Sequence, residues 1–258
     1  MKAMILAAGL GTRLLPLTNT RPKALVEVAG RTLLEITLTR LRSFGIDEVI
    51  VNVHHFADMV ADYLKSHNNF GMRIEISRED DLLLDTGGGL KKAAWFFLDD
   101  PKQNASAITD EPFLLHNVDV ISTIDFARML QSHNERRALA TLAVQSRDSS
   151  RLLLFDDRLQ LCGRRAGPLV KTNQQPEIVR PSAHLEPLAF SGIHVISPRL
   201  LPMITEEGVF SIIPTYLRLA ALGENILAFR ADEYYWRDLG RPSDLAQAAL
   251  DLQQKVYP

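Results

Sequence analysis

Residues 1–23 read MKAMILAAGLGTRLLPLTNTRPK, and this stretch determines how the rest of the chain is interpreted. An apolar run at residues 3–8 leads directly into the glycine-rich segment 9–13, and Pro22-Lys23 follows. A strand that enters a glycine-rich turn is typical of a polyphosphate site, because glycine lets successive backbone N–H groups converge on an anion. Arg13 and Lys23 would neutralise part of that anion's charge. The sequence therefore predicts a phosphate-binding turn directly after the first strand of an α/β fold.

Two common phosphate-binding loops do not fit this segment. A P-loop has four residues between its glycines and then Gly-Lys-Ser/Thr, whereas here Thr12-Arg13 follows a Gly-x-Gly. The dinucleotide fingerprint needs a third glycine or alanine where this chain has Leu14, and an acid near the end of the second strand. The predicted second strand, residues 48–53, ends in Asn-Val instead. The turn therefore belongs to neither the P-loop nor the NAD-binding class.

A longer pattern surrounds the turn. It reads Gly9-x-Gly11-Thr12-Arg13-x-x-Pro16-Leu17-Thr18, with Pro22-Lys23 behind it. This pattern resembles the signature of the sugar-1-phosphate nucleotidylyltransferases, also called NDP-sugar pyrophosphorylases. The resemblance implies attack by a sugar-1-phosphate oxygen on the α-phosphorus of a nucleoside triphosphate, with release of pyrophosphate. The structural alternative is a tight strand-to-helix turn that carries a solvated arginine and lysine.

Composition limits the remaining classes of protein. The chain has 258 residues, 46% of them hydrophobic and 23% charged, which is typical of a soluble globular protein. A net charge of −2 argues against nucleic acid or an anionic membrane surface as the main partner. No apolar run approaches the ~20 residues needed to span a bilayer, and we expect a cytoplasmic protein. Because Cys162 is the single cysteine, an internal disulfide and a cysteine-rich zinc site are excluded.

Apolar runs alternate with segments of helical period through the first half of the chain. The predicted strands are residues 3–8, 48–53, 73–77, 112–116 and 138–144, and the predicted helices are 32–44, 57–66, 88–98 and 125–134. This alternation predicts an α/β fold with a doubly wound, mostly parallel sheet, Rossmann-like and GT-A-like, whose ligands bind beyond the carboxyl ends of the strands. The glycine turn and Asp119 both follow such ends, so we expect them on one rim.

The second half is less regular and predicts a smaller β-rich region on the sugar side. We expect a hairpin from 152–155 and 158–161, a long loop over the site at 163–185, strands at 190–196 and 227–230, and helices at 210–222 and 243–253. We expect one domain, residues 1–258, with a nucleotide-binding half up to about residue 145 and a sugar-binding half from about residue 146. The sequence does not predict the oligomeric state.

The cations of the turn are the predicted catalytic residues. Arginine, with its fork of donors, suits the β- and γ-phosphates that depart as pyrophosphate. Lysine suits the α-phosphate, where charge shifts in the transition state. The resemblance implies the same division between Arg13 and Lys23. The predicted nucleotide-binding residues are Ala8, Gly9, Gly11, Thr12, Arg13, Lys23, Ser77, Thr86 and Gly87; the last two belong to Asp85-Thr86-Gly87-Gly88-Gly89, which would face the base or ribose.

Two aspartates are the predicted magnesium ligands. Mg²⁺ is usually held by one or two carboxylates together with substrate phosphates and water. Asp119 follows the strand 112–116, and Asp238 lies in a Trp-x-Asp-x-Gly segment; both positions match the metal aspartates that the resemblance implies. The first departs from the usual Gly-Asp because Val118 precedes the acid. Gly192, in Phe-Ser-Gly-Ile-His, is the predicted sugar-binding residue, and His194 two residues later is interpreted as structural.

The resemblance also suggests substrates. Asp-Thr-Gly-Gly-Gly, Phe-Ser-Gly-Ile and Trp-x-Asp-x-Gly favour transfer from UTP to a phosphorylated amino sugar, N-acetylmuramate-1-phosphate. Transfer from GTP to mannose-1-phosphate is the alternative. A protein of another class, which binds a nucleotide-sugar without turnover and regulates a partner, is a third hypothesis. The sequence does not assign a cation to the sugar phosphate; Arg164, Arg165, Lys171, Arg180 and Arg237 are the candidates.

Overall fold

The computed structural model describes residues 1–98, 111–171 and 174–254. Within them the helices are α1 (Leu33–Ser43), α2 (Ala57–Ser66), α3 (Asp85–Lys92), α4 (Trp95–Leu98), α5 (Phe126–Glu135), α6 (Ile212–Ala221) and α7 (Pro242–Gln253). The strands are β1 (Lys2–Leu6), β2 (Glu27–Val28), β3 (Arg31–Thr32), β4 (Glu48–Val53), β5 (Arg73–Arg78), β6 (Phe113–Asn117), β7 (Val120–Ser122), β8 (Ala140–Gln145), β9 (Arg151–Phe155), β10 (Leu161–Ala166), β11 (Glu177–Ile178), β12 (Glu186–Ile196), β13 (Ile226–Arg230) and β14 (Trp236–Asp238). No described helix is both long and apolar enough to cross a membrane.

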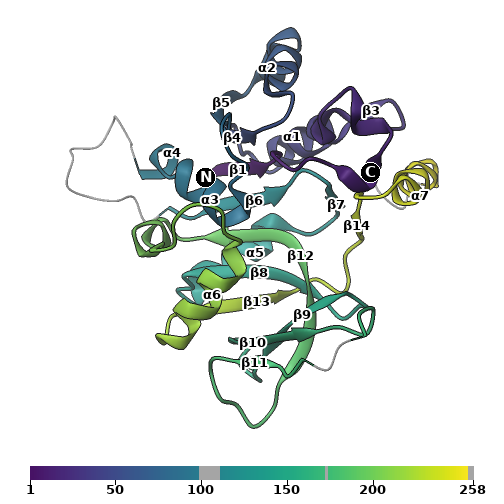
Figure 1. Cartoon of the computed structure of the whole chain (residues 1–258). Coiled ribbons are helices and arrows are strands. Elements are labelled where there is room, and N and C mark those ends of the chain that lie inside the picture. Colours follow the sequence, from purple (N-terminus) through teal and green to yellow (C-terminus); the bar gives the residue numbers. More distant parts are fainter. Residues whose placement is uncertain (99–110, 172–173, 255–258) are drawn as a thin grey trace.

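One mixed sheet runs through the molecule (Figure 1). Its first part is parallel, in the order β5-β4-β1-β6. The long strand β12 then pairs antiparallel with β6, and on its other side it pairs with β8 and, nearer its start, with β9. Strand β13 extends the β8 side in parallel, whereas β10 and β11 extend the β9 side. The predicted α/β sheet with a smaller β-rich region is confirmed.

Helices cover both faces of this sheet, as a doubly wound fold requires. Ala3 and Ile5 of β1 point into a core that includes buried residues of α1, α2, α5 and α7. Met4, between them, points into a second core with α3, α4 and α6. This alternation follows from the strand geometry, in which successive side chains lie on opposite faces.

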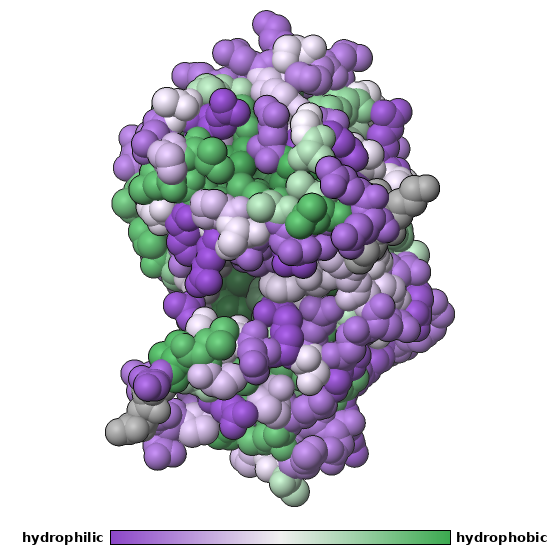
Figure 2. Space-filling view, turned by 90° about the vertical axis from the view of Figure 1, so that its right-hand side faces the viewer, coloured by the Kyte–Doolittle hydropathy of each residue, from purple (hydrophilic) through white to green (hydrophobic). Residues whose placement is uncertain are grey.

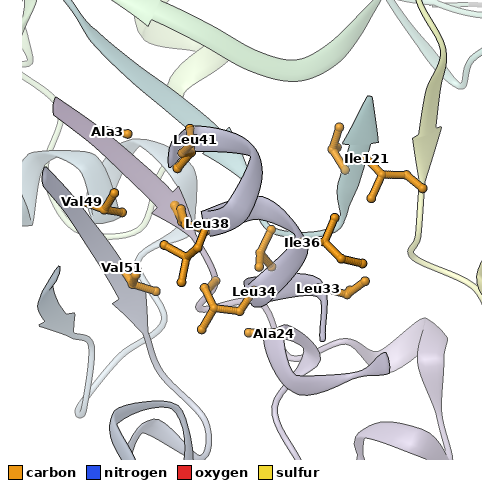
Figure 3. Close-up of a cluster of buried hydrophobic side chains, with 14 of the residues drawn as sticks. Ala3, Ala24, Leu33, Leu34, Ile36, Leu38, Leu41, Val49, Val51 and Ile121 are labelled. Atoms are coloured by element: carbon orange, nitrogen blue, oxygen red, sulfur yellow. The ribbon is translucent and has the colours of Figure 1, made fainter. Parts of the chain in front are cut away.

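Helix α1 illustrates how the sequence fixes the first core (Figure 3). Thr32 caps the helix, because its side chain accepts a hydrogen bond of 3.0 Å from the backbone N–H of Glu35. Leu34, Leu38 and Leu41 are fully buried at helical spacing. Figure 3 shows them facing β1 and β4. The helix therefore fixes the two strands whose carboxyl ends form one side of the site described below.

The expected loop at residues 163–185 is wrong in its first part. Strand β10 runs into it and pairs with β9 and β11, at the far edge of the sheet rather than over the site. The glycine that suggested a loop, Gly163, instead permits close strand contact, since a Cβ there would collide with the carbonyl oxygen of Glu177. Residues 172–173 lie outside the described residues. The expected helix 88–98 is also corrected: α3 begins earlier, at Asp85, and α4 is separate.

The pairing between β7 and β14 was not predicted, although it organises the site. Each strand has three residues, and Trp236, Arg237 and Asp238 lie antiparallel to Ser122, Ile121 and Val120. A segment of only three residues is too short to show the alternation of polar and apolar side chains that predicts a strand. In Figure 1 the two strands lie on the right-hand side, beside the main sheet.

Candidate active site

The glycine turn follows the end of β1 and is held by its own neighbours. Gly11 has a φ of 66°, in the left-handed region, and a Cβ there would lie 2.8 Å from Cγ2 of Thr18. The Thr18 hydroxyl donates a hydrogen bond of 2.9 Å to the Gly11 carbonyl, and the Leu14 N–H donates to the same oxygen at 2.8 Å. Gly9, by contrast, is exposed, and a Cβ added there would have no protein atom within 4 Å. The turn is thus packed against Thr18 at Gly11, whereas Gly9 is exposed to solvent.

The cations of this turn each meet one of the predicted metal ligands. The Lys23 ammonium forms an ion pair with Oδ2 of Asp119, and both side chains are nearly buried. The Arg13 guanidinium nitrogen Nη2 lies 3.7 Å from Oδ1 of Asp238, in a more exposed pair. Residues from the two ends of the chain therefore converge on one place.

Strand pairing brings the two carboxylates together. Asp119 lies in the turn between β6 and β7, and Asp238 ends β14 opposite Val120, the next residue along the chain. The Leu239 N–H donates to the Asp119 carbonyl at 2.7 Å, which closes the pairing. Burial raises the pKa of Asp238, and the charge of Asp119 raises it further. The two carboxylates are therefore close together and partly desolvated, and the charges of Arg13 and Lys23 offset part of their repulsion.

These carboxylates fit a magnesium ion by their chemistry. A raised pKa in a half-buried carboxylate beside a second acid marks a place where an additional cation would be stabilised. Mg²⁺ prefers hard oxygen ligands and commonly takes one or two carboxylates, with substrate phosphates and water completing its shell. The described residues contain no cluster of three or more His, Cys, Asp or Glu side chains suited to a metal. Two carboxylates are enough to hold a Mg²⁺ ion whose remaining ligands are substrate phosphates and water.

The structure explains why position 240, in the Trp-x-Asp-x-Gly segment, is a glycine. A Cβ at this position would lie 2.6 Å from Oδ1 of Asp238 and would collide with the Arg13 guanidinium. The Gly240 N–H also donates to the same Asp238 oxygen, at 2.8 Å. Glycine therefore allows the arginine to lie beside the carboxylate.

The Asp-Thr-Gly-Gly-Gly segment packs tightly against the loop before α6. The N–H groups of Gly87 and Gly88 donate to the Phe210 carbonyl, and a Cβ on Gly87 would collide with the Phe210 ring. The Thr86 hydroxyl accepts a hydrogen bond of 3.0 Å from the Ile212 N–H, at the start of α6. These glycines therefore serve internal packing, and contact of Thr86 and Gly87 with the nucleoside stays a prediction.

A buried polar network was missed in the sequence. The Asn52 side chain accepts from the Ala7 N–H at 2.8 Å and donates to Oε1 of Glu79 at 2.6 Å. The other Glu79 oxygen accepts from the Leu84 N–H at 2.8 Å. Asn52 and Glu79 are almost completely buried, and the predicted residue Ser77 is buried beside Asn52 in the neighbouring strand. The network ties the start of the glycine turn to the segment before α3.

The sugar-side prediction places Gly192 at an irregularity in β12. Its φ is 74°, the pairing with β8 shifts register there, and a Cβ would lie 2.7 Å from Nδ2 of Asn117. His194 is buried and hydrogen-bonds to the Tyr216 hydroxyl at 2.8 Å. Burial lowers the pKa of His194 to about 3, so the ring is neutral and structural.

Several candidate cations for the sugar phosphate are engaged elsewhere. Arg164 pairs with Glu177 at 2.6 Å, and Arg237 pairs with Asp251 at 2.9 Å. Arg180 donates to the backbone carbonyls of Ala220, near the end of α6, and of Glu224 in the turn that follows. The molecule is hollowed on the face that carries β7 and β14, between its upper and lower parts (Figure 2).

Comparisons with known proteins agree with the geometry. A family model described as nucleotidyl transferase matches residues 2–152. N-acetylmuramate alpha-1-phosphate uridylyltransferase from Caulobacter vibrioides is 34% identical over 256 residues, covering 98% of this chain and 96% of the relative. A putative mannose-1-phosphate guanyltransferase from Sulfolobus acidocaldarius is 31% identical, covering 100% of this chain and 65% of the relative.

Solved structures share the fold. The crystal structure of a putative glucose-1-phosphate thymidylyltransferase from Bacillus anthracis, in complex with sucrose, superposes with a TM-score of 0.75 at 18% identity. The superposition covers 100% of this chain and 97% of that one. The family match and the Caulobacter relative carry the assignment further than fold. The chain therefore belongs to the nucleotidyl transferase family, with enzymes that join nucleotides to sugar-1-phosphates as its relatives.

Proposed function

We propose that this enzyme transfers a uridylyl group from UTP to N-acetylmuramate α-1-phosphate, forming the UDP-sugar and pyrophosphate. The convergence of Arg13, Lys23, Asp119 and Asp238 carries the proposal, because two cations and two carboxylates are what a triphosphate with its metal requires. The Caulobacter relative supports the choice of substrates. The product is a cell-wall sugar nucleotide, so we assign the enzyme to cytoplasmic recycling of cell-wall sugar.

The reaction is a displacement at phosphorus. An oxygen of the sugar phosphate forms a bond to the α-phosphorus of UTP, and the bond from that phosphorus to the bridging β-oxygen breaks, so that pyrophosphate leaves with the electron pair. The attacking oxygen is already ionised, and no general base is needed. Catalysis consists mainly of alignment and of neutralising charge. Lys23 binds the α-phosphate and Arg13 binds the departing phosphates, while the backbone of residues 9–12 binds oxygens of the triphosphate.

Asp119 and Asp238 would hold Mg²⁺ in this scheme. The bound ion supplies positive charge that reduces the repulsion between the two phosphate groups. The Lys23 ammonium pairs with Asp119 and supplies part of the counter-charge of that carboxylate. We assign the nucleotide to the half before about residue 145, with Ala8, Ser77, Thr86 and Gly87 on its base side. We assign the sugar to the remaining half, with Gly192 at its edge.

The test is a matrix of the four nucleoside triphosphates against several sugar-1-phosphates, with pyrophosphate release as the readout in the presence of magnesium. The proposal expects the highest kcat/KM with UTP and N-acetylmuramate α-1-phosphate. Turnover confined to GTP and mannose-1-phosphate would reject the substrates while retaining the reaction class. Tight UTP binding without turnover on any acceptor would favour a regulatory protein and overturn the proposal.

The guanylyl alternative has one specific observation behind it. The Sulfolobus relative, a putative mannose-1-phosphate guanyltransferase, is nearly as similar in sequence as the Caulobacter relative. The somewhat higher identity of the Caulobacter relative, 34% against 31%, favours the uridylyl reaction.

A further inference from the structure

Arg147 is a half-buried cation on the sugar side that none of the site predictions includes. It follows the end of β8, in a loop held to the neighbouring chain segment by the Ser146 N–H, which donates to Asp232 at 2.6 Å. One guanidinium nitrogen donates to the Phe190 carbonyl at 2.8 Å, and Nε is buried without a hydrogen-bond partner. Among the described residues, no carboxylate is within ion-pair distance of this guanidinium.

The Arg147 guanidinium is held in position by stacking on Trp236. Its Cζ lies 3.6 Å from the centre of the Trp236 ring, and the Trp236 indole N–H donates to the Ser191 carbonyl at 2.8 Å. The arginine is therefore clamped between a fixed ring and β12, in the strand that carries Gly192. Such a clamp restricts the side chain before any ligand binds, which reduces the entropy lost on binding.

The same arrangement directs the charge toward the metal carboxylates. Trp236 and Asp238 are two residues apart on β14, so their side chains lie on the same face. Burial lowers the pKa of Arg147, and the negative charge of Asp238 opposes this effect, so Asp238 is near enough to act on the guanidinium. In the proposed reaction the acceptor phosphate attacks phosphorus held beside Asp119 and Asp238, so it approaches this place.

We propose that Arg147, stacked on Trp236, binds the phosphate of the acceptor sugar-1-phosphate. This inference rests on the proposed function, since it assigns the acceptor side of the same site. An arginine suits the role because its planar donors bind phosphate oxygens in pairs. The carboxylate of an acidic amino sugar is another oxyanion with the same chemistry, and the experiment separates the two sources.

The experiment compares steady-state pyrophosphate release by the wild type with that of Arg147→Gln, Arg147→Lys and Arg164→Gln. Arg164 is a matched control, since it is an arginine of the sugar half that is already paired with Glu177. We expect Arg147→Gln to raise KM for the sugar phosphate tenfold to about a hundredfold, with KM for UTP changed less than about twofold. Arg147→Lys should recover part of that loss, and Arg164→Gln should match the wild type.

Inhibition distinguishes the phosphate from the carboxylate. N-acetylglucosamine-1-phosphate carries the phosphate alone, and N-acetylmuramate carries the carboxylate alone. We expect Arg147→Gln to weaken inhibition by N-acetylglucosamine-1-phosphate and to leave inhibition by N-acetylmuramate unchanged. The reverse pattern would assign Arg147 to the carboxylate and overturn the proposal. If Arg147→Gln raised KM for the sugar phosphate and KM for UTP equally, Arg147 would have a purely structural role, and this result would also overturn the proposal. A wild type inactive on every substrate pair would reject the proposed function itself, whereas an active wild type with an unaltered variant would reject only this inference.

Discussion

The glycine turn takes its two cations, its glycines and its supporting threonine from residues 9–23, whereas the two carboxylates opposite come from positions 119 and 238. The turn is organised by contacts between near neighbours, such as the Thr18 hydroxyl and the Gly11 carbonyl. The acidic pair exists because β7 and β14, which are far apart in the chain, pair with each other. One side of the site is therefore organised by local contacts, whereas the other depends on strands that are brought together by the whole fold.

Asp119→Asn should have the largest effect, because it removes one carboxylate of the long-range side. We expect a loss in kcat of about a hundredfold or more, since a neutral amide neither holds the metal nor pairs with Lys23. The readout is pyrophosphate release at saturating UTP across a magnesium titration. Asp125→Asn is the control: Asp125 caps α5 through a side-chain oxygen that asparagine also has, and it should retain activity. A near-normal rate in Asp119→Asn would remove the acidic pair from the mechanism.

Asn52→Ala tests whether the glycine turn is independent of residues that are distant along the chain. Alanine would leave the Ala7 N–H and one oxygen of buried Glu79 unpaired, so we expect a loss of about 3 kcal/mol in the free energy of unfolding. Because the same contacts tie the turn to the segment before α3, KM for UTP should also rise. Urea denaturation and UTP kinetics measure the two effects. A stable variant with normal kinetics would show that the turn needs no support from β4 and β5.

The same contrast explains how much the sequence could predict. Strand β4 and helix α2 have the predicted boundaries because hydrophobic period and turn residues are local signals. Arg13 and Lys23 were predicted from one contiguous motif, and the structure places them beside Asp238 and Asp119. The pairing of β7 with β14 and the contact between Asn52 and Glu79 were missed, since partners so distant along the chain leave no periodic pattern. Gly163 was misread as a loop residue because a glycine that permits close strand contact resembles one that permits a turn.

Two glycine variants sharpen the comparison within the turn itself. Gly11→Ala should lower the free energy of unfolding by about 1–2 kcal/mol, because φ is positive and the new methyl group meets Thr18. Gly9→Ala meets no protein atom within 4 Å, so its stability should match the wild type. If the triphosphate lies against the backbone, Gly9→Ala should nevertheless raise KM for UTP. Thermal unfolding and UTP kinetics separate the two; a normal KM in Gly9→Ala would contradict close approach of the ligand.

The smallest effect near neutral pH concerns the pairing of β6 with β12, where the parallel part of the sheet meets its antiparallel part. His116 and His194 are buried there, and burial lowers their pKa values to about 4 and about 3. Below pH 6.5 the unfolded chain binds protons that the folded chain does not, so stability falls as pH decreases from 6.5 towards 4, by up to about 1.4 kcal/mol per pH unit for each histidine. His194→Gln, which retains a hydrogen-bonding group for Tyr216, should flatten this slope in urea denaturation between pH 7 and 5, whereas exposed His184→Gln should not. An unchanged slope in His194→Gln would mean that this buried histidine does not couple folding to protons.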